Sequence, residues 1–428
     1  MQICVIGAGY VGLVAGTCLA NFGHKVVLVD RDQEKVTCLK SGGIPIFEPG
    51  LAEAVAQAKL AEKIGFTSCL EEGMNGAELV FVAVDTPNRA DGSADLSRVL
   101  QVAREISQYL NNFKTIILKS TVPVGGTRLF KETLLGQQKG HNFALLTNPE
   151  FLREGSAIYD FLYPDRVIIG TERTSEARIL ADIYEPISKR IVITTWENAE
   201  LIKYASNAFL ATKISFINEI AGICEKVGGD INKVAEGIGY DSRIGPQFLK
   251  AGVGYGGSCL PKDIKSLIAT GKQLGCEMNL LQSVVRVNLK QRHNLLQKLF
   301  ELLPVKPGLT IGIWGLSFKP DTDDIRESPA LDIVQRLKEV GCRIKAFDPV
   351  AMPNFKRIYP DLDYGQDPYE AVQGVEALLI LTEWKEFMNI NLNQVKNLMT
   401  GQIIIDGRNI FDPQLMKQQG FTYCSVGR

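Results

Sequence analysis

Apolar residues in the first part of the chain form short continuous runs that alternate with longer stretches of helical spacing. Gln2–Ile6 is a short, almost wholly apolar run, as in a strand buried inside a parallel sheet. Residues 13–22 then have the apolar spacing of a helix, and residues 24–29 form a second apolar run. The pattern continues with strands predicted at residues 77–84, 115–118 and 144–147, and a helix at residues 95–110. Strands that alternate with helices in this way predict a doubly wound α/β domain.

The middle of the chain keeps helical spacing over long stretches, with no apolar strand between them. One helix is predicted from residue 195 to about residue 227, without proline or glycine before Gly222, and another from residue 279 to residue 303. A long and largely apolar helix in the centre of a chain has more apolar surface than its own domain covers. This excess predicts a homodimer that forms through the central helix.

The last part of the chain repeats the pattern of the first part. Strands are predicted at residues 309–315, 342–348, 374–381 and 403–408, and a helix at residues 328–340. The predicted fold is therefore α/β, with two Rossmann-like, doubly wound domains joined by a central helical domain with a long helix. The predicted boundaries are residues 1–195 for the first Rossmann domain, 196–304 for the helical domain and 305–428 for the second Rossmann-like domain.

The turn after the first strand carries a dinucleotide-binding fingerprint. Gly7, Gly9 and Gly12 have the spacing G-x-G-x-x-G, and Asp30 ends the next strand. The first glycine allows the turn, the second lets a pyrophosphate approach the backbone, and the third lets helix and strand pack closely. Asp30 would accept hydrogen bonds from ribose hydroxyls and repel a 2′-phosphate, which favours NAD, although Arg31 beside it could bind that phosphate of NADP.

Polar side chains follow three further strands of this domain. Thr86 and Thr121 come at strand ends, where doubly wound sheets bind ligands, so they lie near the nicotinamide or serve as helix caps. The stretch Asn148–Gly155 carries two carboxylates and an arginine around an apolar turn. Such a composition is unusual for a simple connection and predicts a functional loop.

A cysteine lies in a glycine-rich stretch of the middle region. Cys259 follows Gly252, Gly254, Gly256 and Gly257, and the residues after it open a helix with apolar periodicity. Glycine permits a ligand to approach the backbone, and the unpaired amides at a helix N-terminus favour a thiolate. The stretch therefore predicts a reactive thiol, and the alternative is a small buried cysteine.

Two further groups of polar residues carry candidate chemistry. Lys203 and Asn207 lie four residues apart on the central helix and mark either a site or a solvated face. In the last domain the glycine fingerprint is missing, and residues 317–326 form a longer loop with Lys319 and Arg326. Such a copy could bind a mononucleotide through these cations and an aromatic face. Two nucleotide-binding sheets and one reactive cysteine imply two ligands that meet at the thiol.

The composition excludes several functional classes. The 428-residue chain has 45% hydrophobic and 22% charged residues and a net charge of −1, so nothing indicates binding to nucleic acid or to an anionic membrane. Nine unpatterned cysteines indicate reduced thiols in the cytosol. His24, His141 and His293 are isolated, so no metal site is expected. The sequence shows neither a signal peptide nor a run that could span a bilayer, which predicts a soluble cytoplasmic protein.

Four long motifs make the sequence resemble the nucleotide-sugar dehydrogenases of the UDP-glucose/GDP-mannose dehydrogenase family over essentially the whole chain. They are Gly-Ala-Gly-Tyr-Val-Gly from residue 7, Asn-Pro-Glu-Phe-Leu-Arg-Glu-Gly from residue 148, Gly-Gly-Ser-Cys-Leu-Pro-Lys-Asp from residue 256 and Gly-Leu-Ser-Phe-Lys-Pro from residue 315. The resemblance is greatest to the bacterial branch that acts on UDP-glucose. It implies NAD as the cofactor and UDP-glucose as the substrate.

The resemblance also implies roles for individual residues. The implied catalytic residues are Cys259 as nucleophile, Lys203, Asn207 and Asp263 around it, and Thr121 and Glu150, which order water. The implied NAD contacts are Gly7, Gly9, Tyr10, Val11, Gly12, Asp30, Lys35, Thr86, Thr121, Glu154, Lys262 and Arg326. The implied substrate contacts are Glu150, Phe151, Leu152, Arg153, Glu154, Lys203, Asn207, Phe248, Leu249, Lys250, Ala251, Gly252, Gly256, Phe318, Lys319 and Arg408, with Arg243 reaching the sugar of a second subunit.

The implied reaction is a four-electron oxidation of a primary alcohol to a carboxylate through a cysteine thiohemiacetal and thioester. The nearest alternative is a sister activity on GDP-mannose or UDP-N-acetylmannosamine, although the continuation Ser156–Arg166 looks more like the UDP-glucose branch. A two-electron β-hydroxyacid dehydrogenase would need neither Cys259 nor the loop at Lys319. An NAD-sensing protein without catalysis would not need the polar side chains around the thiol.

Overall fold

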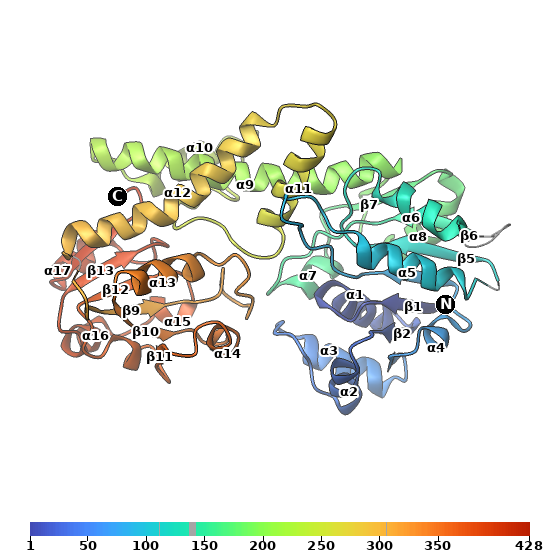
Figure 1. Ribbon diagram of the computed structural model, residues 1–428, viewed down its shortest axis with the longest axis horizontal. Helices are drawn as coiled ribbons and strands as arrows, with labels where there is room; N and C mark the ends of the chain where they lie inside the picture. The colour runs from blue at the N-terminus through green and yellow to red at the C-terminus, as the bar shows by residue number, and fades with distance from the viewer. Residues whose placement is uncertain (111, 137–142, 305) are drawn as a thin grey trace. The chain divides into compact units, whose positions relative to one another are not determined.

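A computed structural model of the chain describes residues 1–110, 112–136, 143–304 and 306–428 (Figure 1). His141 and Val305, the first residue of the third predicted domain, lie outside the described residues. The chain divides into two compact units. The first contains Met1–Ser206 and Lys265–Gly275, and the second contains Asn207–Ile264 and Cys276–Arg428.

The first unit is built on a sheet of eight described strands. They are β1 (Gln2–Ile6), β2 (Lys25–Val29), β3 (Ile64–Thr67), β4 (Leu79–Val82), β5 (Lys114–Leu118), β6 (Phe143–Thr147), β7 (Val167–Thr171) and β8 (Ile191–Thr194). Their order is β3-β2-β1-β4-β5-β6-β7-β8, and neighbours pair in parallel except β6 and β7, which are antiparallel. The central strands are apolar on both faces, as a parallel sheet covered by helices requires.

Helices cover both faces of this sheet. They are α1 (Tyr10–Asn21), α2 (Gln33–Ser41), α3 (Leu51–Leu60), α4 (Leu70–Met74), α5 (Ser97–Ser107), α6 (Gly126–Leu135), α7 (Ala157–Leu162) and α8 (Arg178–Tyr184), with a 3₁₀ turn, η1 (Thr174–Ala177). Successive residues of a strand point to opposite faces. Ile3 and Val5 accordingly pack with α1, α3, α7 and α8, whereas Cys4 and Ile6 pack with α4, α5 and α6.

The chain between the two sheets is helical. Its helices are α9 (Trp196–Val227), α10 (Ile231–Gly239), α11 (Leu260–Gln273) and α12 (Asn279–Leu302). The two long helices predicted from the sequence are therefore confirmed, and α9 continues through Gly222 without a break. The division between the compact units falls inside α9, after Ser206, and inside α11, after Ile264.

The second unit contains a smaller sheet with six strands in the described part of the chain. They are β9 (Thr310–Trp314), β10 (Arg343–Phe347), β11 (Asp363–Tyr364), β12 (Ala377–Ile380), β13 (Ile403–Asp406) and β14 (Thr422–Ser425). All neighbours pair in parallel, in the order β11-β10-β9-β12-β13-β14. This order repeats that of β3-β2-β1-β4-β5-β6 in the first sheet.

Both faces of the second sheet are also covered. The helices that follow β9 are α13 (Pro329–Glu339), α14 (Met352–Lys356), α15 (Lys385–Met388), α16 (Leu392–Leu398) and α17 (Pro413–Gln418), with the 3₁₀ turn η2 (Glu370–Val372). Ile311 and Ile313 pack with α12 and α13, and Trp314 stacks on Phe387 of α15 with ring centroids 5.1 Å apart. The predicted fold class, with two Rossmann-like sheets and helices between them in the sequence, is confirmed.

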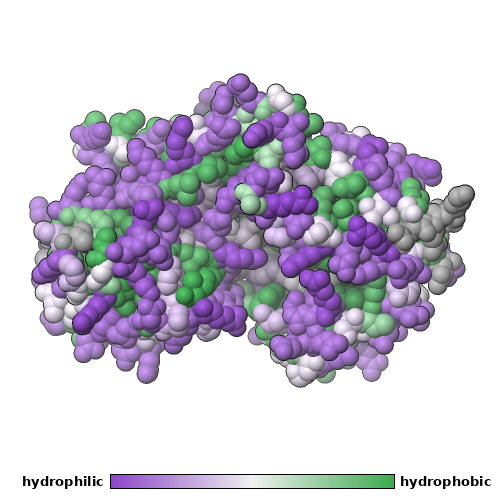
Figure 2. Space-filling view, viewed as in Figure 1, coloured by the Kyte–Doolittle hydropathy of each residue, from purple (hydrophilic) through white to green (hydrophobic). Residues whose placement is uncertain are grey.

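The surface visible in Figure 2 is mainly hydrophilic, with smaller apolar patches between the polar residues. No helix in the described ranges is long and apolar enough to cross a membrane.

Candidate active site

The glycine fingerprint lies between β1 and α1, and each of its three positions requires glycine for a different physical reason. Gly7 has a φ of +101°, and a Cβ there would lie 2.6 Å from the carbonyl oxygen of Ala83. A Cβ at Gly12 would lie 1.8 Å from the carbonyl oxygen of Gly7. A Cβ at Gly9, where φ is −76°, would meet no described atom within 4 Å. The protein gives no reason for glycine at this position, whereas a pyrophosphate that approaches the start of α1 does.

Asp30 ends β2 beside this turn. Its carboxylate accepts hydrogen bonds from the backbone N–H groups of Ala8 (2.8 Å) and Asp32 (3.0 Å) and pairs with Lys35 at 3.0 Å. Burial alone would raise the pKa of Asp30, but these hydrogen bonds and Lys35 bring it below its ordinary value. The ionised carboxylate is only partly buried, so it can accept hydrogen bonds from ribose hydroxyls, and Arg31 next to it is exposed. The turn and Asp30 together fit a dinucleotide.

Thr86 follows β4 and Thr121 follows β5, and the two residues are joined by a hydrogen bond. The Thr86 hydroxyl donates to the carbonyl oxygen of Thr121 at 2.7 Å. The N-cap residues of the helices that follow them are Leu96 and Gly125. Neither threonine therefore caps the helix after it, and their contact with a cofactor stays a prediction.

Glu150 and Lys203 form a buried ion pair. The Lys203 Nζ on α9 lies 2.9 Å from the Glu150 Oε1, and the backbone N–H of Leu152 donates to the other oxygen at 2.6 Å. Burial alone would raise the pKa of Glu150, but the charge and hydrogen bond of Lys203 bring it below its ordinary value. Glu150 is therefore ionised, the form in which a carboxylate acts as a base. Because Lys203 is buried, the interpretation of a solvated helix face is wrong for this lysine.

The ring of Phe151 contacts two cations. The guanidinium carbon of Arg166 lies 3.6 Å from the ring centroid, and the Lys203 Nζ lies 5.2 Å from it. Arg166 immediately precedes β7, and the antiparallel pairing of β6 with β7 brings the start of β7 beside the residues that follow β6. Cation–π contacts of this kind contribute about 0.5–2 kcal/mol each, so they fix the ring beside the ion pair.

A second buried lysine anchors the start of the same loop. The Lys119 Nζ donates to the Asn148 Oδ1 at 3.0 Å and to the Tyr184 hydroxyl at 3.4 Å. The Asn148 side-chain amide donates in turn to the carbonyl oxygen of Ile168 on β7 at 2.8 Å. Burial lowers the pKa of Lys119 to about 8. The loop that carries Glu150 thus begins on a rigid polar support.

Cys259 lies directly before α11, as the sequence predicted. Its carbonyl oxygen accepts a hydrogen bond from the backbone N–H of Asp263 at 2.9 Å, which forms the first turn of the helix. The thiol is partly exposed, unlike the buried Cys4 and Cys18. The alternative of a fully buried structural cysteine is therefore wrong.

Close packing explains the glycines that precede the cysteine. A Cβ at Gly256 would lie 2.4 Å from the carbonyl oxygen of Glu327. Gly257 has a φ of +85°, and a Cβ there would lie 2.7 Å from the ring of Phe318. The backbone N–H of Gly257 also donates to the carbonyl oxygen of Arg326 at 2.9 Å. Residues 317–327 are thus packed tightly against the cysteine loop.

Buried polar side chains from two helices hold the other end of this loop. The backbone N–H of Gly252 donates to the Asn218 Oδ1 on α9 at 2.8 Å. Asn288 on α12 bonds both the N–H of Tyr255, at 2.8 Å, and its carbonyl oxygen, at 3.0 Å. Arg292, one turn further along α12, donates to the same carbonyl at 3.4 Å. The backbone before Cys259 is therefore held by hydrogen bonds with side chains that are themselves buried.

Asp263 forms a compact polar group with two of the predicted residues. Its carboxylate is 1% exposed and accepts hydrogen bonds from the Asn207 Nδ2 and from the Lys262 Nζ, each at 2.6 Å. Asn207 lies one turn after Lys203 on α9. The first unit thus contains Thr121 and the pair of Glu150 and Lys203, and the second contains Cys259 and the group around Asp263.

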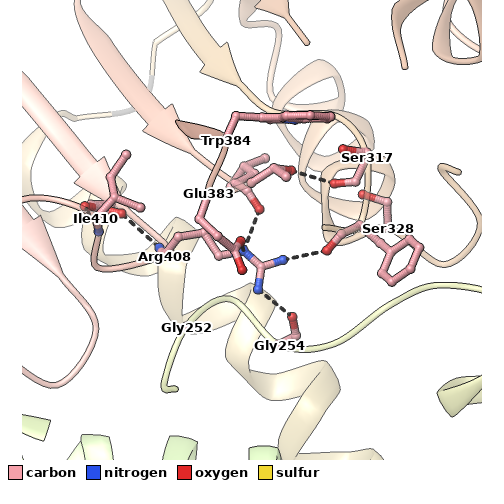
Figure 3. A network of polar contacts seen from close by, with 12 residues as sticks. Gly252, Gly254, Ser317, Ser328, Glu383, Trp384, Arg408 and Ile410 are labelled. Atoms are coloured by element: carbon pink, nitrogen blue, oxygen red, sulfur yellow. Dashed lines mark hydrogen bonds and ion pairs between the residues drawn. The ribbon is translucent and has the colours of Figure 1, made fainter. Parts of the chain in front are cut away.

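Arg408 follows β13 and joins several segments of the second unit (Figure 3). Its guanidinium donates to the carbonyl oxygens of Leu381 at 2.8 Å, Phe318 at 2.9 Å and Gly254 at 3.4 Å. It also pairs with Glu383 at 3.1 Å. The arginine therefore ties the cysteine loop to the carboxyl ends of the strands, and its predicted contact with a sugar stays a prediction.

Backbone strain concentrates in these segments. Of the five described non-glycine residues with positive φ, one is Glu62 of the first unit. The others are Phe248 (+64°), Asp321 (+62°), Glu327 (+53°) and Asn409 (+56°). Such conformations persist where the surrounding structure enforces them, and they occur often at ligand sites.

The remaining predicted residues lie along the same segments. Leu249 and Ala251 are buried, and Leu152, Glu154 and Lys319 are partly buried. Lys250 is exposed, and three exposed arginines face neighbouring acids: Arg153 faces Asp160, Arg243 faces Asp241, and Arg326 faces Asp324.

Sequence reasoning missed several residues that shape the site. Asn288 and Arg292 lie four apart on α12, which is the spacing that singled out Lys203 and Asn207, but the many other polar residues of this helix hid them. Arg166 carried no such signal, because only the direction of β7 brings it to Phe151. Glu48 also gave none, because it lies outside any periodic run.

The comparisons with known proteins agree over the whole chain. Models of the UDP-glucose/GDP-mannose dehydrogenase family match its NAD binding domain at residues 1–188, its central domain at 197–290 and its UDP binding domain at 312–413. The chain is 46% identical over 429 residues to a UDP-glucose 6-dehydrogenase of Bacillus subtilis, a match that covers 100% of this chain and 93% of the relative. It is 44% identical to a UDP-glucose 6-dehydrogenase of Rhizobium meliloti, with 100% of both chains covered.

Solved structures give the same result. A UDP-glucose dehydrogenase from Pyrobaculum islandicum matches with a TM-score of 0.94 at 37% identity, over 100% of this chain and 97% of that one. A UDP-N-acetyl-mannosamine dehydrogenase from Staphylococcus aureus matches with a TM-score of 0.82 at 26% identity, over 100% and 98%. The resemblance inferred from the sequence motifs is confirmed: the chain belongs to the UDP-glucose/GDP-mannose dehydrogenase family.

Proposed function

We propose that the chain oxidises UDP-glucose to UDP-glucuronate with NAD as the electron acceptor. The observation that carries the proposal is Cys259, a partly exposed thiol directly ahead of α11, in a chain 46% identical over its length to a UDP-glucose 6-dehydrogenase. In this proposal residues 1–195 bind NAD, residues 196–304 supply the thiol, and residues 305–428 bind the UDP group.

The cofactor site is the turn between β1 and α1. NAD, when bound, accepts one hydride in each of two oxidation steps. The open position at Gly9 admits the pyrophosphate, and Asp30 binds the ribose hydroxyls. The other proposed contacts, from the family resemblance, are Tyr10, Val11, Lys35, Thr86, Thr121, Glu154, Lys262 and Arg326.

The first oxidation turns the C6 alcohol into an aldehyde, and the hydroxyl proton must go to a base. The Asp263 carboxylate takes up this proton through water, and the Lys203 ammonium stabilises the charge that develops on the C6 oxygen. Asp263 suits the task because Asn207 and Lys262 already hold its buried carboxylate in one orientation.

The second oxidation passes through the thiol. The Cys259 thiolate adds to the aldehyde carbon, so that a C–S bond forms and the carbonyl oxygen becomes an alkoxide. Lys203 and Asn207 stabilise the charge on that oxygen. Loss of a hydride from the same carbon then leaves a thioester on the cysteine.

Hydrolysis completes the cycle. Water attacks the thioester carbon, the C–S bond breaks, and the thiolate and the carboxylate product are released. Glu150 is ionised beside Lys203, so it can take the proton of this water, and Thr121 helps to orient it. The predicted substrate contacts are residues 150–154, 248–252, Gly256, Phe318, Lys319 and Arg408.

The test measures how many NADH are formed for each UDP-glucose and compares the wild type with a Cys259 variant. The wild-type chain should form two NADH for each UDP-glucose consumed, whereas Cys259→Ala should bind NADH normally and form no UDP-glucuronate. Cys276→Ala, which removes an exposed thiol after α11, is the matched control and should keep full activity. Normal UDP-glucuronate formation by Cys259→Ala would reject the mechanism. Assays with GDP-mannose and UDP-N-acetylmannosamine decide between UDP-glucose and the sister substrates.

A homodimer is proposed through α9. Phe209, Phe216 and Ile223 recur every seven residues on this helix, and their side chains are 66%, 49% and 56% exposed. An apolar stripe with this spacing suits packing against the same helix of a second copy. Phe216→Ser should therefore give a monomer in analytical ultracentrifugation. Ile358→Ser, which replaces an exposed apolar residue away from α9, is the control, and a dimer that survives Phe216→Ser would contradict the proposal.

The proposed setting is the cytoplasm. All nine cysteines lie within the described residues and are free, although several are exposed or partly exposed. Reduced thiols of this kind persist where glutathione and thioredoxin operate.

A further inference from the structure

One carboxylate in the first unit binds both the dinucleotide turn and the loop after β6. Glu48 lies between α2 and α3 and is 6% exposed. Its Oε2 accepts a hydrogen bond from the Tyr10 hydroxyl and one from the backbone N–H of Gly155 at 2.6 Å. Its Oε1 accepts one from the backbone N–H of Ala157 at 2.7 Å. Gly155 also lies within hydrogen-bond distance of the Tyr10 hydroxyl oxygen, at 2.9 Å.

The groups that meet at Glu48 come from segments with different proposed ligands. Tyr10 is the first residue of α1, inside the glycine fingerprint, where the pyrophosphate would bind. Gly155 and Ala157 directly follow residues 150–154, which the proposed function assigns to the nucleotide sugar, and Ala157 begins α7.

A buried carboxylate is costly to leave without donors, and hydrogen bonds to a charged acceptor are strong. Loss of any one donor therefore leaves the Glu48 carboxylate with too few hydrogen bonds. The carboxylate is then held less firmly, so its hydrogen bonds to the other donors also weaken. Conversely, a ligand that restrains Tyr10 favours the arrangement in which Gly155 and Ala157 are also held.

We propose that Glu48 is a positioning residue that couples the binding of NAD to the ordering of the substrate loop. The identity of the second ligand rests on the proposed function. Because coupling between two ligands is reciprocal, the nucleotide sugar must also strengthen the binding of the dinucleotide.

The first test measures this coupling without turnover. NADH cannot accept a hydride, so NADH and UDP-glucose form a dead-end complex. Titration by NADH fluorescence, with and without saturating UDP-glucose, gives the ratio of the two dissociation constants. For the wild type we expect tighter NADH binding with UDP-glucose, by roughly 5- to 100-fold. Glu48→Gln and Tyr10→Phe should bring this ratio close to one, because each breaks the hydrogen bond between the two segments.

The matched control is Glu53→Gln, which removes an exposed carboxylate from the first turn of the neighbouring helix α3. It should keep the wild-type ratio. A simple loss of stability would weaken both titrations equally and leave the ratio unchanged, so the ratio separates positioning from structure. A wild-type ratio of one, or a wild-type ratio in Glu48→Gln, overturns the proposal.

The second test needs no sugar and therefore remains decisive if UDP-glucose proves not to be the ligand. Hydrogen–deuterium exchange of the peptide that covers residues 150–157 is compared with and without NADH. NADH should slow this exchange on the order of tenfold in the wild type and in Glu53→Gln, and not in Tyr10→Phe. Tyr10→Phe keeps the ring and removes one hydroxyl, so it carries the test if Glu48→Gln fails to fold. Equal protection by NADH in Tyr10→Phe and in the wild type would refute the linkage.

Discussion

Each sheet carries an acid at the end of its second strand, and the two acids have different surroundings. Asp30, after β2, bonds two backbone N–H groups and Lys35 and keeps part of its surface open. Asp348, after β10, is completely buried. The groups that donate to Asp348 are the backbone N–H groups of Leu316, Ser317, Val350 and Ala351, the hydroxyl of Ser317 and the indole of Trp384.

The comparison shows that spare acceptor capacity, and not topology, distinguishes an acid that can bind a ribose from an acid that holds its own turn together. A carboxylate offers about four lone-pair positions, and six donors already surround Asp348. The turn that follows the first strand of each sheet also differs between the two sheets. Gly315 keeps the positive φ of Gly7, at +92° against +101°, but Ser317 stands where the first sheet has Gly9. The Ser317 hydroxyl donates to Asp348, so this turn lacks the open position that Gly9 provides in the first sheet.

The largest expected effect is the loss of Asp348. Asp348→Ala would leave six donors, most of them buried, without their acceptor, and we expect the free energy of unfolding to fall by about 3–5 kcal/mol. Asp30→Ala should cost about 1 kcal/mol, because water can replace the carboxylate there. Urea denaturation of both variants measures this difference. Equal losses of unfolding free energy would mean that Asp348 is no more important for stability than Asp30.

The glycines should separate stability from binding inside one turn. Gly7→Ala forces a side chain into positive φ and against Ala83, so we expect unfolding to become easier by about 2 kcal/mol or more. Gly9→Ala meets open space and should keep the wild-type urea midpoint while NADH binds roughly tenfold more weakly. Fluorescence titration and urea denaturation of both variants test this. A destabilised Gly9→Ala would show that the protein, and not the ligand, requires the glycine.

A smaller change is expected for the specificity of the first sheet. Asp30→Asn keeps the size of the side chain and removes its charge, so NADH should bind about fivefold more weakly and the preference over NADPH should narrow. Competition titrations with both reduced cofactors measure the preference. Arg31→Ala is the control, since that exposed residue should add little to NADH binding. An unchanged preference in Asp30→Asn would assign the discrimination to another residue.

The smallest expected effect is a pH dependence. The pKa of folded Asp30 lies below the ordinary value of 3.8, so the folded chain binds this proton less tightly than the unfolded chain does. The stabilising contribution is therefore complete above that ordinary value and is lost as the pH falls through the lower folded pKa. The stability difference between wild type and Asp30→Asn should be constant down to about pH 5 and shrink near pH 3. A stability difference that grows as the pH falls would mean that folding raises the pKa of Asp30 and does not lower it.

The sequence predicted the fold and the chemical groups better than it predicted their partners. Apolar runs and helical spacing located both sheets and the two long helices, because burial on both faces of a strand leaves a direct pattern. The same holds for Gly12, where a Cβ would meet the nearby Gly7, and for Cys259, which directly precedes α11.

Contacts between distant segments gave no such pattern. The pair of Glu150 and Lys203 joins residues 53 positions apart, and Glu48 meets Gly155 across 107 positions. No local rule distinguishes these carboxylates from surface ones. Their partners follow from the order and direction of the strands, which the sequence alone left open.

The reversal of β7 has a consequence for how such sites can be altered. In a purely parallel sheet, only residues that leave a strand reach the edge where ligands bind. Here Arg166, which enters a strand, reaches Phe151 as well. A library of variants at Arg166 would therefore change the surroundings of Phe151, in the loop of residues 150–154, while all residues of the dinucleotide turn stay the same.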